Sequence, residues 1–127
     1  MKKVTAKRLM IGDWVMWKGE YRKVVGLWLN YDRDSLIDLG SVISTKSATP
    51  IPITEEWLML NGFKKHFDTF FMNLTANTQI TFVLLYFTLR IYRENEIVSY
   101  TLNIQYIHQL QQAYRLATGG KELKLKF

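Results

Sequence analysis

The most apolar run of the chain, residues 80–92 (ITFVLLYFTLRIY), constrains the fold more than any other segment. It carries Arg90 and is shorter than the roughly 20 residues that a membrane-spanning helix needs. Its aromatic and β-branched residues favour a pleated strand instead. The run therefore predicts one buried strand, whose side chains alternate between two faces. One face is expected to carry Thr81, Val83, Leu85, Phe87, Leu89 and Ile91, and the other Phe82, Leu84, Tyr86, Arg90 and Tyr92.

Other strand signals lie on both sides of this run. Apolar residues at 14–17 and 21–29 flank a Lys18-Gly19-Glu20 turn, which predicts a hairpin. Two short strands are expected at 35–39 and 42–45, on either side of Gly40. A meander is expected over 63–101, with turns at 73–78 and 93–96, and alternation over 122–127 predicts a closing strand.

Two segments predict helices. Thr54 is a good N-cap, and Glu55 and Glu56 place negative charge at the positive end of the helix dipole, so a short helix is expected over Glu55 to Asn61. A longer amphipathic helix is expected over 104–118, where the apolar residues fall within an arc of roughly 120°. Asn103 is its expected cap, and Gly119-Gly120 its expected end.

Together these elements predict an α+β fold of mostly antiparallel strands with one short and one long helix. The chain has 127 residues, enough to bury a core, so a single domain is expected over 1–127. Within it, the strand-rich portion 1–50 is expected to form a small SH3-like barrel, and 51–127 to hold the helices, the meander and the closing strand. The absence of cysteine excludes thiol catalysis and disulfides, and no signal peptide is seen, so a cytoplasmic location away from membranes is expected.

Several segments also occur together in a recognisable order: 9–15 (LMIGDWV), 19–21 (GEY), 50–58 (PIPITEEWL), 61–63 (NGF), 106–111 (YIHQLQ) and 118–123 (TGGKEL). As a set they resemble the motifs of a family of small uncharacterised proteins encoded in prophages and mobile elements of gut bacteria. Members of that family pair an Ile-Pro-Leu-Thr-Glu-Glu-like helix start with a Tyr-Val-His-Gln-Leu-Gln-like helix. The resemblance implies a phage-related or mobile-element-related accessory protein in a bacterial host, and it implies no catalytic residues.

The residue pattern supports neither a metal site nor a catalytic centre. The histidines are His66 and His108, and no His-x-x-x-His pair places two imidazoles on one helix face. The acidic group at 32, 34 and 38 begins like a calcium loop, but Ile43 stands where that loop needs an acidic residue. His108 has no nucleophile motif to serve, and Gly-rich phosphate loops are absent from the sequence. We therefore expect a non-enzymatic protein without metal or cofactor.

Two surfaces are candidates for protein contacts. The polar ridge of the second helix predicts a protein partner, and its residues are His108, Gln111, Gln112 and Arg115. The second face of the 80–92 strand, at Phe82 and Tyr86, is a candidate for pairing two copies in a homodimer. In the alternative interpretation the Gln-rich face meets water and a helix of the same chain covers the strand.

Nucleic-acid binding is the other hypothesis. The chain has 17 Lys+Arg against 11 Asp+Glu, a formal net charge of +6, which attracts polyanions. Basic residues near Trp14 and Trp17 combine phosphate neutralisation with rings on which exposed bases can stack. The candidate residues, in the basic N-terminal arm and the first hairpin, are Lys7, Arg8, Lys18, Arg22 and Lys23. A solvated face is the alternative for these side chains. The first hypothesis is a non-enzymatic accessory protein acting through protein contacts, and the second is a nucleic-acid-binding module.

Overall fold

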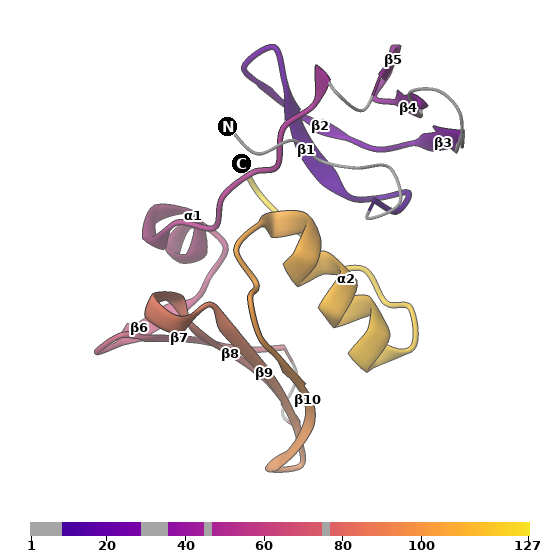
Figure 1. Cartoon of the computed structure of the whole chain (residues 1–127). Helices are drawn as coiled ribbons and strands as arrows, with labels where there is room; N and C mark the ends of the chain where they lie inside the picture. Colours follow the sequence, from indigo (N-terminus) through magenta and orange to yellow (C-terminus); the bar gives the residue numbers. More distant parts are fainter. Residues whose placement is uncertain (1–8, 29–35, 45–46, 75–76) are drawn as a thin grey trace. The chain divides into compact units, whose positions relative to one another are not determined.

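A computed structural model describes residues 9–28, 36–44, 47–74 and 77–127 (Figure 1). These residues divide into two compact units. Unit 1 runs to Ile51 and includes Tyr106–His108, and unit 2 comprises Pro52–Gln105 and Gln109–Phe127. The division after Ile51 lies next to the one expected between the strand-rich portion and the remainder. A single domain over the whole chain stays a prediction.

Unit 1 begins with the predicted hairpin. Strand β1 (Trp14–Trp17) pairs antiparallel with β2 (Glu20–Lys23). Lys18 (φ 50°) and Gly19 (φ 75°) are both left-handed, as a two-residue hairpin turn requires. The hairpin is therefore confirmed, because its turn chemistry is local and readable from sequence.

The second strand of this hairpin is shorter than the predicted run 21–29. The Val24 N–H donates to the Asp13 carbonyl at 2.8 Å, whereas the next N–H, of Val25, donates to the Asp38 carbonyl at 2.8 Å. The chain thus leaves one sheet and enters another between these two residues. Strand β3 (Gly26–Trp28) then pairs with β4 (Leu36–Asp38), which pairs with β5 (Val42–Ser44).

The two sheets of unit 1 share a small apolar core. Its buried residues are Leu9, Val15, Val24, Leu39 and Ala48, and Trp17, Leu27 and Ile43 pack against it. The two-stranded and three-stranded sheets are separate, and neither closes on itself within the described residues. The α+β class is thus confirmed, whereas the SH3-like barrel stays a prediction.

Unit 2 contains α1 (Glu55–Leu60) and most of α2 (Ile107–Thr118). The predicted short helix is confirmed, with Thr54 as its N-cap and Asn61 as its C-cap. The second helix begins three residues later than predicted, because the Ile104 N–H donates to the Phe87 carbonyl and the Gln105 carbonyl accepts from Ile53. Because the backbone groups of Ile104 and Gln105 form these long-range hydrogen bonds, these two residues are not part of the helix. In the described part of the chain, no helix has the length and apolar character needed to cross a membrane.

A five-stranded antiparallel sheet forms the rest of unit 2, with strand order β10-β9-β8-β7-β6. Figure 1 shows α1 and the unit 2 part of α2 on one side of this sheet. The predicted meander and its two turns are confirmed. The strands are β6 (Lys64–His66), β7 (Thr69–Asn73), β8 (Thr78–Val83), β9 (Thr88–Arg93) and β10 (Glu96–Thr101).

The prediction of one strand over 80–92 is wrong. A 3-10 turn, η3 (Leu84–Tyr86), interrupts the run, and Phe87 takes a left-handed conformation (φ 52°), so β8 and β9 form a hairpin. The reversal pairs Phe82 with Leu89, so even-numbered residues of β8 share a face with odd-numbered residues of β9. The two expected faces are therefore mixed. One face of the five-stranded sheet is buried, and its buried residues are Phe70, Ile80, Phe82, Leu89 and Ile91.

The predicted closing strand is also wrong. Residues 121–127, all within the described part, belong to no strand. Leu123 is buried, while the Lys126 N–H donates to the Asn61 side chain at 2.7 Å and the Asn61 amide donates back to the Lys126 carbonyl at 3.1 Å. Hydrogen bonds with the Asn61 side chain, at the end of α1, thus hold the C-terminal segment in place of the predicted strand pairing.

The N-cap of α1 supports a stability prediction. The Trp57 N–H donates to the Thr54 hydroxyl at 3.2 Å, and this bond satisfies a helix-end amide. Thr54→Ala should lower the free energy of unfolding by about 1 kcal/mol, measured by urea denaturation. Thr54→Ser keeps the hydroxyl and should stay close to the wild type. An equal loss in both variants would contradict the capping role.

Candidate functional site

The face of the five-stranded sheet opposite the buried one carries a row of side chains with one member from each strand. Hydrogen-bonded register places these residues side by side, and the row reads Lys64, Phe71, Thr81, Arg90 and Tyr100. Neighbouring strands lie about 4.8 Å apart, so the row spans roughly 19 Å. We call this surface the open face. Its row brings together two aromatic rings, two cations and a hydroxyl.

The open face is electropositive. Strand positions that point to it alternate with the buried ones, and among them are Lys64, His66 and Arg90. Within the described strands, no Asp or Glu occupies an open-face position. An anion therefore meets attraction along the strands of this face, and Glu94, in the β9–β10 turn, is an acidic side chain at one end of it.

Arg90 is the centre of this charge. Its Cζ lies 5.3 Å from the centroid of the Tyr100 ring, a cation–π distance. Hydrogen bonds with the Tyr92 and Tyr100 side chains raise the pKa of the Arg90 guanidinium above its ordinary value. The guanidinium is charged at any ordinary pH and lies beside tyrosines of β9 and β10.

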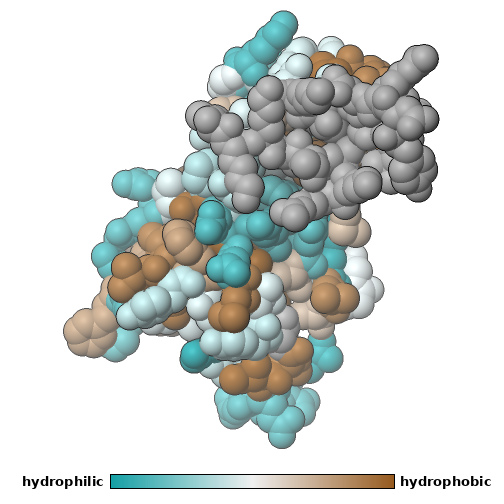
Figure 2. All heavy atoms as spheres, in the orientation of Figure 1, coloured by the Kyte–Doolittle hydropathy of each residue, from teal (hydrophilic) through white to brown (hydrophobic). Residues whose placement is uncertain are grey.

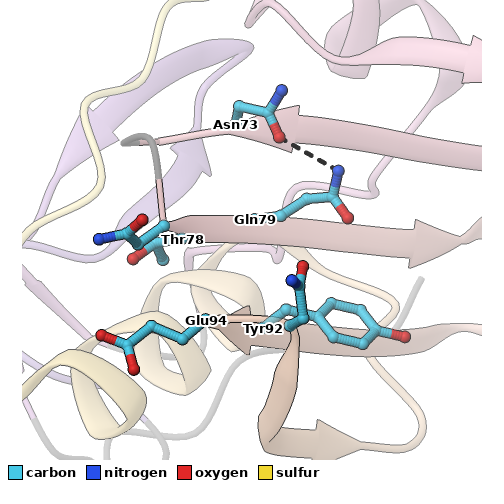
Figure 3. Close-up of a pocket in the computed structure, with 7 residues that line it drawn as sticks. Asn73, Thr78, Gln79, Tyr92 and Glu94 are labelled. Atoms are coloured by element: carbon cyan, nitrogen blue, oxygen red, sulfur yellow. Dashed lines mark hydrogen bonds between the residues drawn. The ribbon is translucent and has the colours of Figure 1, made fainter.

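One end of the open face is hollowed into what we call the amide pocket (Figure 3). Its volume is about 320 Å³, and it lies between the β7–β8 and β9–β10 turns. Gln79 Nε2 donates to Asn73 Oδ1 at 3.1 Å, which orients two amides on neighbouring strands. Amides both donate and accept hydrogen bonds, so the pocket suits a ligand with both kinds of group. The lining residues are Asn73, Asn77, Thr78, Gln79, Tyr92, Glu94 and Asn95.

A second hollow of about 570 Å³ adjoins the amide pocket at Gln79. It extends along the open face toward the β6 edge, where cationic and imidazole side chains line it. Its residues are Lys64, Lys65, His66, Thr69, Phe71, Gln79 and Thr81. Gln79 lines both hollows.

The nucleic-acid residues predicted in the first hairpin are only partly together. Lys18 Nζ lies 4.8 Å from the Trp17 ring centroid, and Arg22 Cζ lies 5.9 Å from it. Arg22 also pairs with Glu20 at 2.6 Å. Lys18 and Arg22, both from the hairpin, thus already lie against the Trp17 ring. Lys23 is exposed on β2, and the predicted residues Lys7 and Arg8 lie outside the described part of the chain.

The polar ridge predicted on the second helix is largely buried. His108, Gln111 and Arg115 are 5%, 2% and 6% exposed, and Gln112 is half-buried. Arg115 Nε pairs with Glu122 Oε1 at 2.7 Å. Helical periodicity placed these four polar residues on one side of the helix. It did not show that Glu122, which follows the helix, pairs with Arg115. Most of the ridge is therefore not an accessible surface, and its role in partner binding stays a prediction.

The His108 imidazole supports a pH prediction. Burial lowers the pKa of His108 below its ordinary value, and the charge of Asp13 opposes the shift in part. The unfolded chain therefore binds a proton near pH 6.5 that the folded protein binds only at lower pH, so stability should fall as the pH drops below about 6.5. The slope is at most about 1.4 kcal/mol per pH unit. Urea denaturation at a series of pH values measures it.

His108→Gln removes the titrating group and should flatten this slope, even if it changes the stability at neutral pH. An unchanged slope in His108→Gln would assign the pH dependence to other groups.

The open-face residues were missed as a site in the sequence. Phe71, Arg90 and Tyr100 counted only as parts of the meander, because their common row depends on pairing between strands far apart in sequence. A weak signal was present: polar residues alternate with the buried ones at Asn73, Gln79 and Thr81. Such alternation is typical of a sheet with one solvated face.

Among the residues that the structure describes, no three His, Asp or Glu side chains gather into a group that could hold a metal ion. Searches with this chain find no matching family model, no matching curated protein and no matching solved structure. The resemblance to the prophage and mobile-element proteins therefore stays a prediction.

Proposed function

We propose that the protein is a non-enzymatic binding protein that holds single-stranded nucleic acid on the open face of its five-stranded sheet. The observation that carries this proposal is the row Lys64, Phe71, Thr81, Arg90 and Tyr100. It combines the two kinds of group that single strands need, rings for base stacking and cations for phosphates.

Stacking favours a single strand over a duplex. Every base has a π-face, but bases inside a duplex already stack on one another. Tyr100 is 54% exposed on the edge strand, and Phe71 lies half-buried two strands beyond Arg90. Bases of a single strand can stack on Phe71 and on the side of the Tyr100 ring that Arg90 does not cover, while the phosphates lie near Lys64 and Arg90.

The amide pocket gives the face a means to read a base. Asn73 and Gln79 present donors and acceptors at fixed positions, and Tyr92 lines the same pocket. The Watson–Crick edge of an unpaired base carries both donors and acceptors. We expect a modest base preference from this pocket, and affinity that comes mainly from stacking and charge.

The net charge of +6 supports the same role, because a basic chain attracts nucleic acid at long range. An accessory role in a phage or mobile element is compatible with it and remains part of the proposal.

Fluorescence anisotropy with a labelled single-stranded oligonucleotide tests the proposal. Affinity should fall steeply with salt and should exceed that for a duplex of the same length. Lys64→Gln should reduce the slope of log affinity against log salt by about 0.7, the value for one phosphate contact on a single strand.

Lys23→Gln is the matched control, because Lys23 is an exposed strand lysine of the first hairpin. The slope should be unchanged in this variant. A slope that falls for Lys23→Gln and not for Lys64→Gln would move the binding site to the hairpin. No binding at low salt would reject nucleic acid altogether.

A further inference from the structure

A second surface of unit 2 is apolar and shares only Lys65 with the hollows of the open face. It is a hollow of about 930 Å³ between the start of α1, the β6–β7 turn and η3. Brown, apolar atoms are exposed near α1 and β6 in Figure 2. We call the hollow the apolar groove, and its residues are Ile53, Glu55, Lys65, Phe67, Asp68, Phe70, Leu84, Leu85 and Phe87.

Two phenylalanines at the groove have backbone conformations that bulky residues rarely adopt. Phe67 has φ 57° in the β6–β7 turn, and Phe87 has φ 52° after η3. Glycine or asparagine would fit such positions with less strain. The fold gains little burial from Phe67, whose side chain is 83% exposed. A strained, exposed aromatic residue of this kind points to a contact outside the chain.

The patch contains both a projection and a hollow. Phe67 and Leu85 (67% exposed) project beside the groove that they help to line. An interface between two identical copies needs a self-complementary surface, in which the projection of each copy fits the hollow of the other. This patch offers both parts within one copy.

The charges at the groove also permit a second copy to approach. Like copies of a chain with net charge +6 repel one another where cations are unpaired. At the groove, Lys65 Nζ pairs with Glu55 Oε1 at 2.7 Å, and Asp68 adds a negative charge. The groove is thus not electropositive, in contrast to the open face.

We propose that two copies of the protein associate symmetrically, with Phe67 of each copy seated in the apolar groove of the other. The exposed apolar parts of Phe67, Leu85, Tyr86 and Phe87 amount to about 400–500 Å² per copy, since an aromatic side chain buries roughly 150–250 Å². The pair would bury about 800–1,000 Å², which is below the ~1,200 Å² of stable specific interfaces. The dimer is therefore weak and depends on concentration.

Sedimentation equilibrium of the full chain, without nucleic acid, tests this proposal. The wild type should pass from monomer to dimer between micromolar and millimolar concentration. Phe67→Gly removes the projecting ring and relieves the left-handed backbone, so the fold should be kept while the dimer dissociation constant rises at least tenfold. Leu116→Ala is the matched control, because Leu116 is 87% exposed on α2 and does not line the groove.

The dimer should persist at high salt, where nucleic-acid binding is lost, so the two proposals fail separately. A wild type that stays monomeric up to millimolar concentration would overturn the dimer. So would association that Leu116→Ala weakens and Phe67→Gly does not, because another apolar surface would then be responsible.

Discussion

Arg90→Glu should weaken the binding of a single-stranded oligonucleotide roughly 100-fold at low salt. Arg90 lies at the centre of the open face, and its guanidinium contacts the Tyr100 ring of the neighbouring strand. A hydrogen bond to a charged group contributes about 1.5–3 kcal/mol, and each ~1.4 kcal/mol is a factor of ten in affinity. The new carboxylate also repels phosphates. Fluorescence anisotropy measures the change.

Arg93→Glu is the control for this experiment. Arg93 lies on the same strand, and its odd-numbered position directs it to the other side of the sheet from Arg90. The same charge reversal should therefore reduce affinity only a few-fold, through the net charge. Arg90→Gln, which removes the charge without reversing it, should give an intermediate loss. Equal losses from Arg90→Glu and Arg93→Glu would indicate non-specific attraction in place of a site.

Phe82→Ala should lower the free energy of unfolding by about 3–5 kcal/mol, the usual cost of truncating a buried phenylalanine. Phe82 is 0% exposed and lies between Phe70 and Leu89 in the register of the sheet. Its removal leaves a cavity on the face that the helices cover. Because small domains are stable by only about 5–15 kcal/mol, most of the stability should be lost. Urea denaturation followed by circular dichroism measures it.

Val83→Ala is the matched control, because Val83 is the next residue of β8 and lies half-buried on the open face. It should cost much less than Phe82→Ala. A larger loss at Val83 than at Phe82 would mean that the buried and open faces of the sheet are assigned the wrong way round.

Elements with local signals were predictable from the sequence. The helix over 55–60 follows from its Thr54 cap and first-turn acids, and the hairpin at 14–23 follows from its Lys18-Gly19 turn. The turns of the meander at 73–78 and 93–96 follow from polar residues between apolar runs. Each of these features depends on residues within a few positions of one another.

Features that depend on distant pairing were not predictable. The break at Leu84–Phe87 carries no glycine or proline, and it forms because β8 folds back to pair with β9. The late start of α2 has a similar cause, since residues 104 and 105 bond to segments near 87 and 53. Apolar periodicity alone cannot show such bonds.

The open face could not be predicted from the sequence for the same reason. Lys64 and Tyr100 are 36 positions apart in sequence, and they join one row only through the register of five strands. Sequence directed attention to cations with aromatic rings in the first hairpin, where they are close along the chain, and a site there stays a prediction.

An NMR titration of the isotope-labelled protein with a short single-stranded oligonucleotide tests the central claim most directly. We predict that the backbone amide signals of Phe71, Thr81, Arg90 and Tyr100 shift progressively as oligonucleotide is added, together with those of Asn73 and Gln79. Shifts confined to Lys18, Arg22 and Lys23 of the first hairpin, or no shifts at low salt, would contradict the assignment of the open face as the binding site.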